Sequence, residues 1–173
     1  MNSNVRIENA IPGDMEFIFF LYEKAIRFQK KSGFNIWQGY DKAVLTQELE
    51  AGLLHKLIIN GRIALVFSAI YSDKLLWFER EKEDAVYVHR LVVNPEMRGQ
   101  KLFRHVFEWM LEDAKKRGRK YLRLDTWGDN PKLTNYYINC GFRLLGIVAP
   151  ESTELLPKHY NCISLSLLEI KIE

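Results

Sequence analysis

Apolar residues in the first half of the chain recur at spacings typical of strands and helices. Alternation from Val5 to Glu8 predicts a short strand, and apolar positions at helical spacing from Met15 to about Gly33 predict a helix. A second short helix is expected from about Lys42 to Ala51. The stretch HKLIINGRIALVFSAI predicts two strands joined at Asn60-Gly61, because both positions of a tight hairpin turn tolerate positive φ.

The second half alternates strands with helices. After an expected loop over SDKLLWFEREKED, a β-branched strand is predicted from Ala85 to Val93 and a helix from Arg98 to Arg117. The inward face of this helix is expected to consist of Leu102, Val106, Met110 and Ala114. The remaining predicted elements are a strand at Tyr121 to Thr126, a helix at Pro131 to Cys140 capped by Gly141, and strands at Phe142 to Val148 and Asn161 to Leu168.

This order of elements predicts an α/β fold. Two parallel strands need a crossover connection, and the helix between the strands at 85–93 and 121–126 supplies one. We therefore expect these two strands to be parallel neighbours that diverge at their C-terminal ends, where ligands of open α/β sheets collect. A structure with the two strands antiparallel would contradict this prediction.

The length, composition and charge of the chain indicate a single globular domain. The chain has 173 residues, of which 47% are hydrophobic, and a formal net charge of +3. Cys140 and Cys162 have no CxxC spacing, which indicates free thiols in a reducing compartment and no structural metal site. The N-terminus lacks an apolar signal core and no run is long enough to span a membrane, so a cytoplasmic protein is expected.

The stretch VHRLVVNPEMRGQKLF joins an apolar strand to an Arg-Gly step and a basic helix start. A helix N-terminus offers unpaired N–H groups and a partial positive charge, where a phosphate is stabilised. Gly99 permits a close backbone approach, and basic side chains at Arg98, Lys101 and Arg104 add positive charge. The stretch therefore predicts a phosphate-binding site, with an ordinary structural turn as the alternative.

Three motifs resemble the GNAT N-acetyltransferase family: LVVNPEMRGQKLF, LRLDTWGDN and NPKLTNYYINCGF. The resemblance extends over Val5 to Leu168 in element order and is most specific from Tyr87 to Gly146. It implies one domain over residues 1–173, with a mixed α/β (α+β) sheet of about seven strands, splayed between the fourth and fifth, and about four flanking helices. It also implies transfer of an acetyl group from acetyl-CoA (coenzyme A) to an amine.

The resemblance assigns cofactor contacts to the end of the central strand and to the following loop. The pantetheine arm would lie along the strand edge, and the pyrophosphate would lie at the helix start. The implied cofactor-binding residues are Leu91, Val92, Val93, Arg98, Gly99, Gln100, Lys101, Leu102, Phe103, Arg104, Asn130, Lys132 and Tyr136. Lys101 and Phe103 occupy places where the family has small residues. We expect Lys101 in a right-handed first turn, whereas the bulky Phe103 would either crowd the pyrophosphate or fill a void.

Two residues are the catalytic candidates. An amine near pKa 10 is mostly protonated at neutral pH, so a base is expected. By resemblance this base is His89, with Glu79 or water as alternatives and a histidine satisfied inside the sheet as the structural reading. The resemblance makes Tyr137 the acid that protonates the departing thiolate, against a plain core tyrosine.

Large aromatic residues near predicted loops are candidates for the acceptor pocket, where an ammonium rests favourably on a ring face. The weaker substrate-pocket candidates are Trp37, Tyr40, Trp77, Glu79, Trp127, His159 and Tyr160. The alternative is that these residues are simply half-buried and have no role in binding. Cys140 is assigned to packing, and Asn130 could serve only as a helix N-cap.

Other functions remain open at this stage. An acyl-CoA-binding module without turnover is the main alternative to an enzyme. Nucleic-acid binding is not expected, because AKKRGRK is a short basic run at a helix end beside acidic residues. The sequence does not decide whether the amine belongs to a small molecule or a peptide, or whether the chain forms a homodimer.

Overall fold

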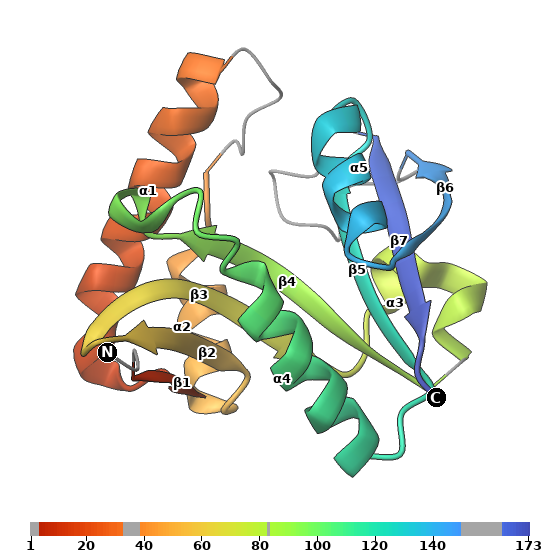
Figure 1. The fold of residues 1–173 in the computed structure, drawn as a ribbon, viewed down its shortest axis with the longest axis horizontal. Helices are drawn as coiled ribbons and strands as arrows, with labels where there is room; N and C mark the ends of the chain where they lie inside the picture. Colours follow the sequence, from red (N-terminus) through yellow and green to blue (C-terminus); the bar gives the residue numbers. More distant parts are fainter. Residues whose placement is uncertain (1–3, 33–38, 83, 150–163) are drawn as a thin grey trace.

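The computed structural model describes residues 4–32, 39–82, 84–149 and 164–173, and in these residues seven strands form one sheet (Figure 1). The strands are β1 (Val5–Asn9), β2 (Leu54–Ile59), β3 (Arg62–Ile70), β4 (Ala85–Val93), β5 (Tyr121–Trp127), β6 (Arg143–Val148) and β7 (Leu165–Lys171). The helices are α1 (Met15–Ser32), α2 (Lys42–Glu50), α3 (Lys74–Trp77), α4 (Phe103–Lys116) and α5 (Pro131–Asn139). The predicted α/β class is therefore confirmed.

The strand order is β1-β2-β3-β4-β5-β7-β6, and the only parallel pair among these strands is β4 with β5. The predicted hairpin between β2 and β3 is present, with positive φ at both Asn60 (50°) and Gly61 (80°). Helix α4 connects β4 to β5 as a crossover, which is the connection that a parallel pair requires. The sheet is thus mixed, as the sequence predicted.

Alternating residues of the strands supply cores on the two faces of the sheet. Leu65 belongs to the core that α4 covers, whereas its neighbour Val66 belongs to the core that α1 and α2 cover. A third core lies under α3, on the side of Tyr87. Figure 1 shows α4 and α5 in front of the sheet, with α2 and α3 behind it.

Two segments differ from the sequence prediction. The stretch predicted as a loop after β3 contains α3 and a 3-10 helix at Phe78–Lys82, because Leu76 and Trp77 are buried and anchor a helical turn. The last strand ends later than predicted, with β7 paired as far as Lys171, whereas its predicted start at Asn161 lies outside the described residues. Beyond Leu168, the buried Glu169 pairs with Arg123 of β5 and Arg143 of β6.

In the described parts of the chain, no helix is long and apolar enough to cross a membrane.

Candidate active site

Strands β4 and β5 are paired only over their first halves. The parallel register runs from Ala85 opposite Tyr121 to Val88 opposite Leu124, and no later residue of β4 pairs with β5. Strand β5 continues beside β7 as far as Trp127. The two strands therefore separate after Val88 (Figure 1), which confirms the predicted parallel pair with diverging ends.

A bulge in β4 lies where the separation begins. On the β3 side, His89 pairs with Ser68 but Val92 pairs with Val66, so Arg90 and Leu91 together face a single residue. Arg90 has a φ of 53°, a left-handed conformation that is unusual for a residue with a long side chain. The buried hydroxyl of Tyr22 on α1 donates a hydrogen bond of 2.7 Å to the Arg90 carbonyl. The bulge is thus fixed from α1.

The Arg90 side chain is fixed from a second helix. Glu48 on α2 is only 7% exposed, and its carboxylate accepts hydrogen bonds from Ser68 Oγ (2.6 Å) and Arg90 Nε (3.1 Å). The second guanidinium nitrogen also pairs with this carboxylate. A buried carboxylate needs such partners, so Glu48 and Arg90 depend on each other. Together with Tyr22, they hold the backbone next to His89.

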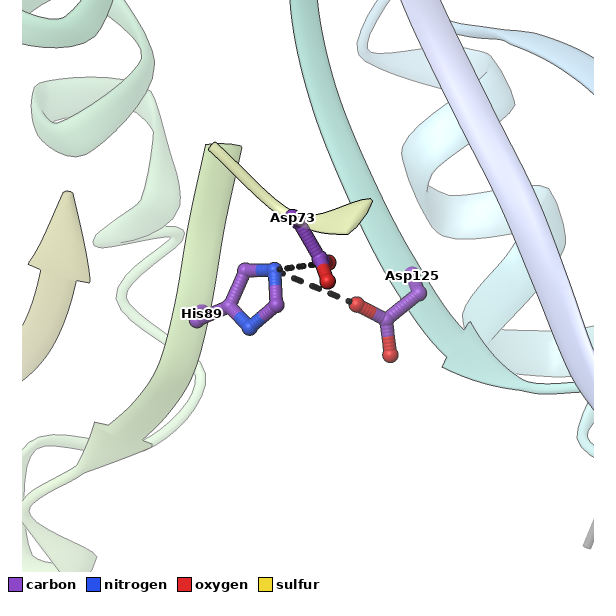
Figure 2. A group of neighbouring side chains, drawn as sticks. All are labelled: Asp73, His89 and Asp125. Atoms are coloured by element: carbon purple, nitrogen blue, oxygen red, sulfur yellow. Dashed lines mark ion pairs between the residues drawn. The ribbon is translucent and has the colours of Figure 1, made fainter. Parts of the chain in front are cut away.

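His89 is the first residue of β4 beyond the paired region, and it lies between two carboxylates (Figure 2). Its Nε2 atom is 3.1 Å from Asp73 Oδ2 and 3.6 Å from Asp125 Oδ1. The side chains of His89 and Asp73 are 5% and 8% exposed. Both atoms are buried, and within the described residues neither Nε2 nor Asp73 Oδ2 has a partner in hydrogen-bond geometry.

The electrostatics of this cluster favour a proton on the imidazole. Burial alone lowers the pKa of His89, but Asp73 and Asp125 outweigh it and the pKa is raised. Burial raises the pKa of Asp125, although the nearby His89 opposes this. Figure 2 shows the other ring nitrogen, Nδ1, on the side of the ring away from both carboxylates. The ring thus has one nitrogen held by acids and one directed elsewhere.

Sequence analysis missed Asp73 and Asp125. Asp73 lies directly before α3, in a segment that was predicted as a loop, and nothing local marks it. Asp125 could have been noticed, because a charged residue within the predicted central strand LRLDTW needs a buried partner. That partner is His89, 36 residues away in sequence and adjacent only because β4 and β5 are neighbours.

The loop after β4 has the backbone expected of an anion site. Backbone N–H groups at positions 99–103 have no hydrogen-bond partner within the described residues. Gly99 (φ 79°) and Lys101 (φ 53°) are left-handed, and residues alternating in this way form a concave nest of N–H groups. These donors are available to an anion.

Two predictions about this loop are wrong. Helix α4 begins at Phe103 and not at Arg98, because the left-handed residues interrupt the helical backbone before it. Lys101 is not in a right-handed first turn for the same reason. A left-handed lysine costs about 1 kcal/mol, so this position is one where glycine would be less strained.

The basic residues near the loop differ in their surroundings. The Arg98 guanidinium lies 3.7 Å from the centre of the Phe28 ring of α1, and partial burial lowers its pKa. Arg104 is exposed and lies 4.0 Å from Glu108. Lys132 and Gln100 are also exposed. Arg98 is thus the one held against the fold, beside the open N–H groups.

The strand residues assigned to the cofactor have mixed burial. Val92 is buried in the core beneath α1, while Leu91 and Val93 are partly buried against the core beneath α4. Leu102 is buried as part of that second core. Any contact with a cofactor along this strand would therefore use the β4 backbone edge that β5 leaves unpaired.

Phe103 fills the core between α4 and α5. It is 5% exposed, and its ring lies 5.0 Å from Tyr137, 6.3 Å from Tyr136 and 6.2 Å from Phe142 between centroids. Of the two alternatives that the sequence raised, the structure has the ring filling the core. The bulky side chain thus fixes α5 against α4.

Tyr137 is partly buried on α5, and no hydrogen bond of its hydroxyl is found among the described residues. Burial raises its pKa, with smaller contributions from Tyr136, Cys140 and Asp125.

Asn130 is the N-cap of α5 and accepts a hydrogen bond from the Leu133 N–H (3.0 Å), as one of its two expected roles required. Cys140 packs against the α4 core, as assigned.

The other pocket candidates are dispersed. Trp77 is 1% exposed and packs against Tyr87, so it is a core residue, and Trp127 is also buried at the end of β5. Tyr40 is half-buried beside Tyr22, with ring centroids 5.2 Å apart. Glu79 is exposed in the turn after α3. The remaining candidates, Trp37, His159 and Tyr160, and also Cys162, lie outside the described residues.

The site thus consists of a split parallel strand pair, a histidine at the split, and a loop after β4 whose N–H groups have no partner within the described residues. Comparison with known proteins assigns the chain to a family. Residues 40–142 match the acetyltransferase (GNAT) family, and the chain belongs to this family. Membership confirms the predicted activity, that of an N-acetyltransferase with acetyl-CoA as its acetyl donor.

Individual relatives agree with this assignment. The uncharacterized N-acetyltransferase YesJ of Bacillus subtilis is 26% identical over 145 residues, which cover 79% of this chain and 81% of YesJ. A GNAT acetyltransferase structure from Listeria monocytogenes has a TM-score of 0.79 at 21% identity and covers 97% of this chain and 95% of its own. The structure of yncA from Salmonella typhimurium with its cofactor acetyl-CoA has a TM-score of 0.68 at 15% identity, with 98% and 94% covered. At these identities the structural matches establish the fold.

Proposed function

We propose that this acetyltransferase acts on a primary amine, with His89 as the base and Tyr137 as the acid. The observation that carries the proposal is the position of His89, the first residue of β4 that no longer pairs with β5. An extended thioester arm along the free edge of this strand would bring its reacting end to that point. The open N–H groups of 99–103 then meet the pyrophosphate at the other end of the same strand edge.

The reaction proceeds by direct transfer in this proposal. The ammonium gives a proton to His89, and the neutral nitrogen attacks the thioester carbonyl carbon. Backbone N–H groups of β4 near Val92 stabilise the oxygen as it becomes negative. As the C–S bond breaks, Tyr137 gives its proton to sulfur, and the proton that the new amide nitrogen loses restores the tyrosine. One amide, one thiol and one proton result.

The acceptor is a small-molecule or peptide amine in this proposal. Similar structures include the ribosomal-protein-S18-alanine N-acetyltransferase of Escherichia coli and an agmatine N-acetyltransferase, so the fold serves both kinds of acceptor. We also infer a cytoplasmic enzyme, because the two cysteines have no CxxC spacing in the sequence. We infer one domain over the 173 residues, because the described strands form a single sheet. A homodimer is compatible with the proposal, which needs only one chain.

Thiol release from acetyl-CoA with a panel of amines tests the proposal. The panel should hold polyamines, amino acids, aminoglycosides and peptides with free N-termini. We expect amine-dependent thiol release that falls about 10²-fold or more in His89→Gln. Asp84→Asn is a suitable control, because it also changes one polar side chain next to β4 but at an exposed site. An acyl-CoA-binding module would bind acetyl-CoA and release no thiol with any amine.

A further inference from the structure

Two buried carboxylates are left without a role by the proposed chemistry. Asp73, from the segment before α3, and Asp125, from β5, both face the Nε2 side of His89 (Figure 2). A buried carboxylate is costly, and a pair of them near one another is more so. Asp73 Oδ2 is also buried, and no partner in hydrogen-bond geometry is found for it in the described part of the chain. The placement of Asp73 and Asp125 beside His89 is therefore costly in free energy, which indicates a functional role for the two carboxylates.

The charged groups around His89 come from several elements. Asp73 and Asp125 are the nearest, and Arg90 acts on Asp125 from the bulge. Arg90 is itself neutralised by Glu48 of α2. The Tyr87 ring lies 6.3 Å from the His89 ring, and Tyr137 on α5 is near enough for Asp125 to contribute to its raised pKa. With Arg90 and Glu48 cancelling, the net charge next to the imidazole is negative.

We propose that Asp73 and Asp125 are positioning residues that keep the proton of neutral His89 on Nε2, so that Nδ1 presents its lone pair to the amine. This inference deepens the proposed function and rests on it. A neutral imidazole carries one proton, and the nitrogen that faces an acceptor keeps it. Here the two carboxylates, Asp73 and Asp125, both lie on the Nε2 side, while Nδ1 points away from them.

The same carboxylates stabilise the product of the proton transfer. When Nδ1 takes a proton from the ammonium, the ring becomes an imidazolium with both carboxylates beside Nε2. One N–H bond of the ammonium breaks and one N–H bond at Nδ1 forms, and Nε2 keeps its proton throughout. The ring later returns the Nδ1 proton to solvent. This is the orienting role that an acid next to a catalytic histidine has in other enzymes.

Nitrogen-15 NMR of the histidine side chains tests the tautomer directly. The chain has four histidines, and the signals missing in His89→Gln are those of His89. In the wild-type protein above the His89 pKa, we expect a protonated Nε2 and an unprotonated Nδ1. A neutral ring with its proton on Nδ1 would overturn the proposal, and this outcome needs no variant that must fold.

Variants supply the second readout. In Asp73→Asn and Asp125→Asn we expect the tautomer preference to weaken and the plateau of kcat/KM to fall at least ~10-fold. The acidic limb of the pH profile should also move to lower pH, because one carboxylate no longer favours the imidazolium. Asp84→Asn, with the same side-chain change, should leave both readouts as in the wild type. Unchanged tautomer and limb in both site variants would refute the proposal.

Two further outcomes are distinguishable. If no amine is acetylated but Nε2 carries the proton, the proposed function fails while the role of the carboxylates stands. Addition of zinc chloride to chelator-treated protein tests whether the cluster binds a metal ion, since one ligand atom each of Asp73, His89 and Asp125 lie within 4.8 Å of one another. Loss of the Nε2 proton on stoichiometric zinc binding would make the cluster a metal site and overturn the proposal.

Discussion

Replacing Tyr137 with Phe tests the assignment of the acid with the least disturbance of the fold. The ring stays in the aromatic cluster, where it lies 5.0 Å from Phe103 and 6.2 Å from Phe142. Only the hydroxyl is removed, and it makes no hydrogen bond within the described residues. The free energy of unfolding should therefore change by less than ~1 kcal/mol.

The magnitude of the rate effect follows from the raised pKa of Tyr137. Burial makes the phenol a weaker acid than a free tyrosine, whose pKa is already above that of a free thiol, about 8.5. Proton transfer to the sulfur is then uphill, so the hydroxyl helps by a modest amount. We expect kcat to fall by roughly 10- to 100-fold, or about 1.4 to 2.7 kcal/mol in the barrier.

Steady-state thiol release, calorimetric binding of acetyl-CoA and thermal melting measure the three quantities. Tyr121→Phe is the matched control, because Tyr121 lies at the opposite end of β5 from the split and should keep its wild-type rate. If Tyr137→Phe loses stability and keeps kcat, Tyr137 is a structural residue and is removed from the mechanism.

Three further predictions concern the cofactor loop, the bulge and the base. Arg98→Ala should weaken coenzyme A binding by about 1 to 3 kcal/mol in calorimetry, whereas Phe28→Leu, which keeps the charge of Arg98, should weaken it less. Equal losses in the two variants would mean that the stacking of Arg98 on Phe28, and not the charge, determines binding. Tyr22→Phe removes the hydrogen bond to the Arg90 carbonyl, so it should lower the free energy of unfolding in urea by about 1 to 3 kcal/mol and should also lower kcat. An unchanged kcat would separate the bulge from catalysis. Because the pKa of His89 is raised in the folded state, protonation of His89 stabilises the fold fully below about pH 6.5, and this contribution disappears as pH rises through the folded-state pKa. The difference in the free energy of unfolding between wild type and His89→Gln, measured in urea, should therefore become smaller with rising pH. A difference that grows with pH would contradict the raised pKa.

Elements with local signals were predictable from the sequence. The Asn60-Gly61 turn has two positions that need positive φ, and the structure has positive φ at both. Asn130 before Pro131 announces the start of α5, and the capping hydrogen bond is present. The apolar positions of α4 are buried as the spacing predicted. In each case the residues that determine the structure are close together in sequence.

Features that depend on distant contacts were not predictable. The left-handed Arg90 is held by Tyr22 and Glu48, which no local pattern connects to it. The start of α4 was misplaced because Lys101, unlike a glycine, gives no sign of a left-handed backbone. The carboxylate of Asp73 reaches His89 only through the packing of the segment around α3. The family motifs pointed to His89, which we propose as the base, but not to the groups that surround it.

The most direct test of the central claim is the fate of a labelled acetyl group. Acetyl-CoA carrying a ¹³C acetyl is incubated with the protein and the amine that gives thiol release, and the products are followed by mass spectrometry. The account predicts one labelled acetyl on the amine nitrogen for each thiol released, at a rate that drops sharply in His89→Gln. Acetyl-CoA that binds tightly and remains intact with every amine, or equal rates in wild type and His89→Gln, would contradict it.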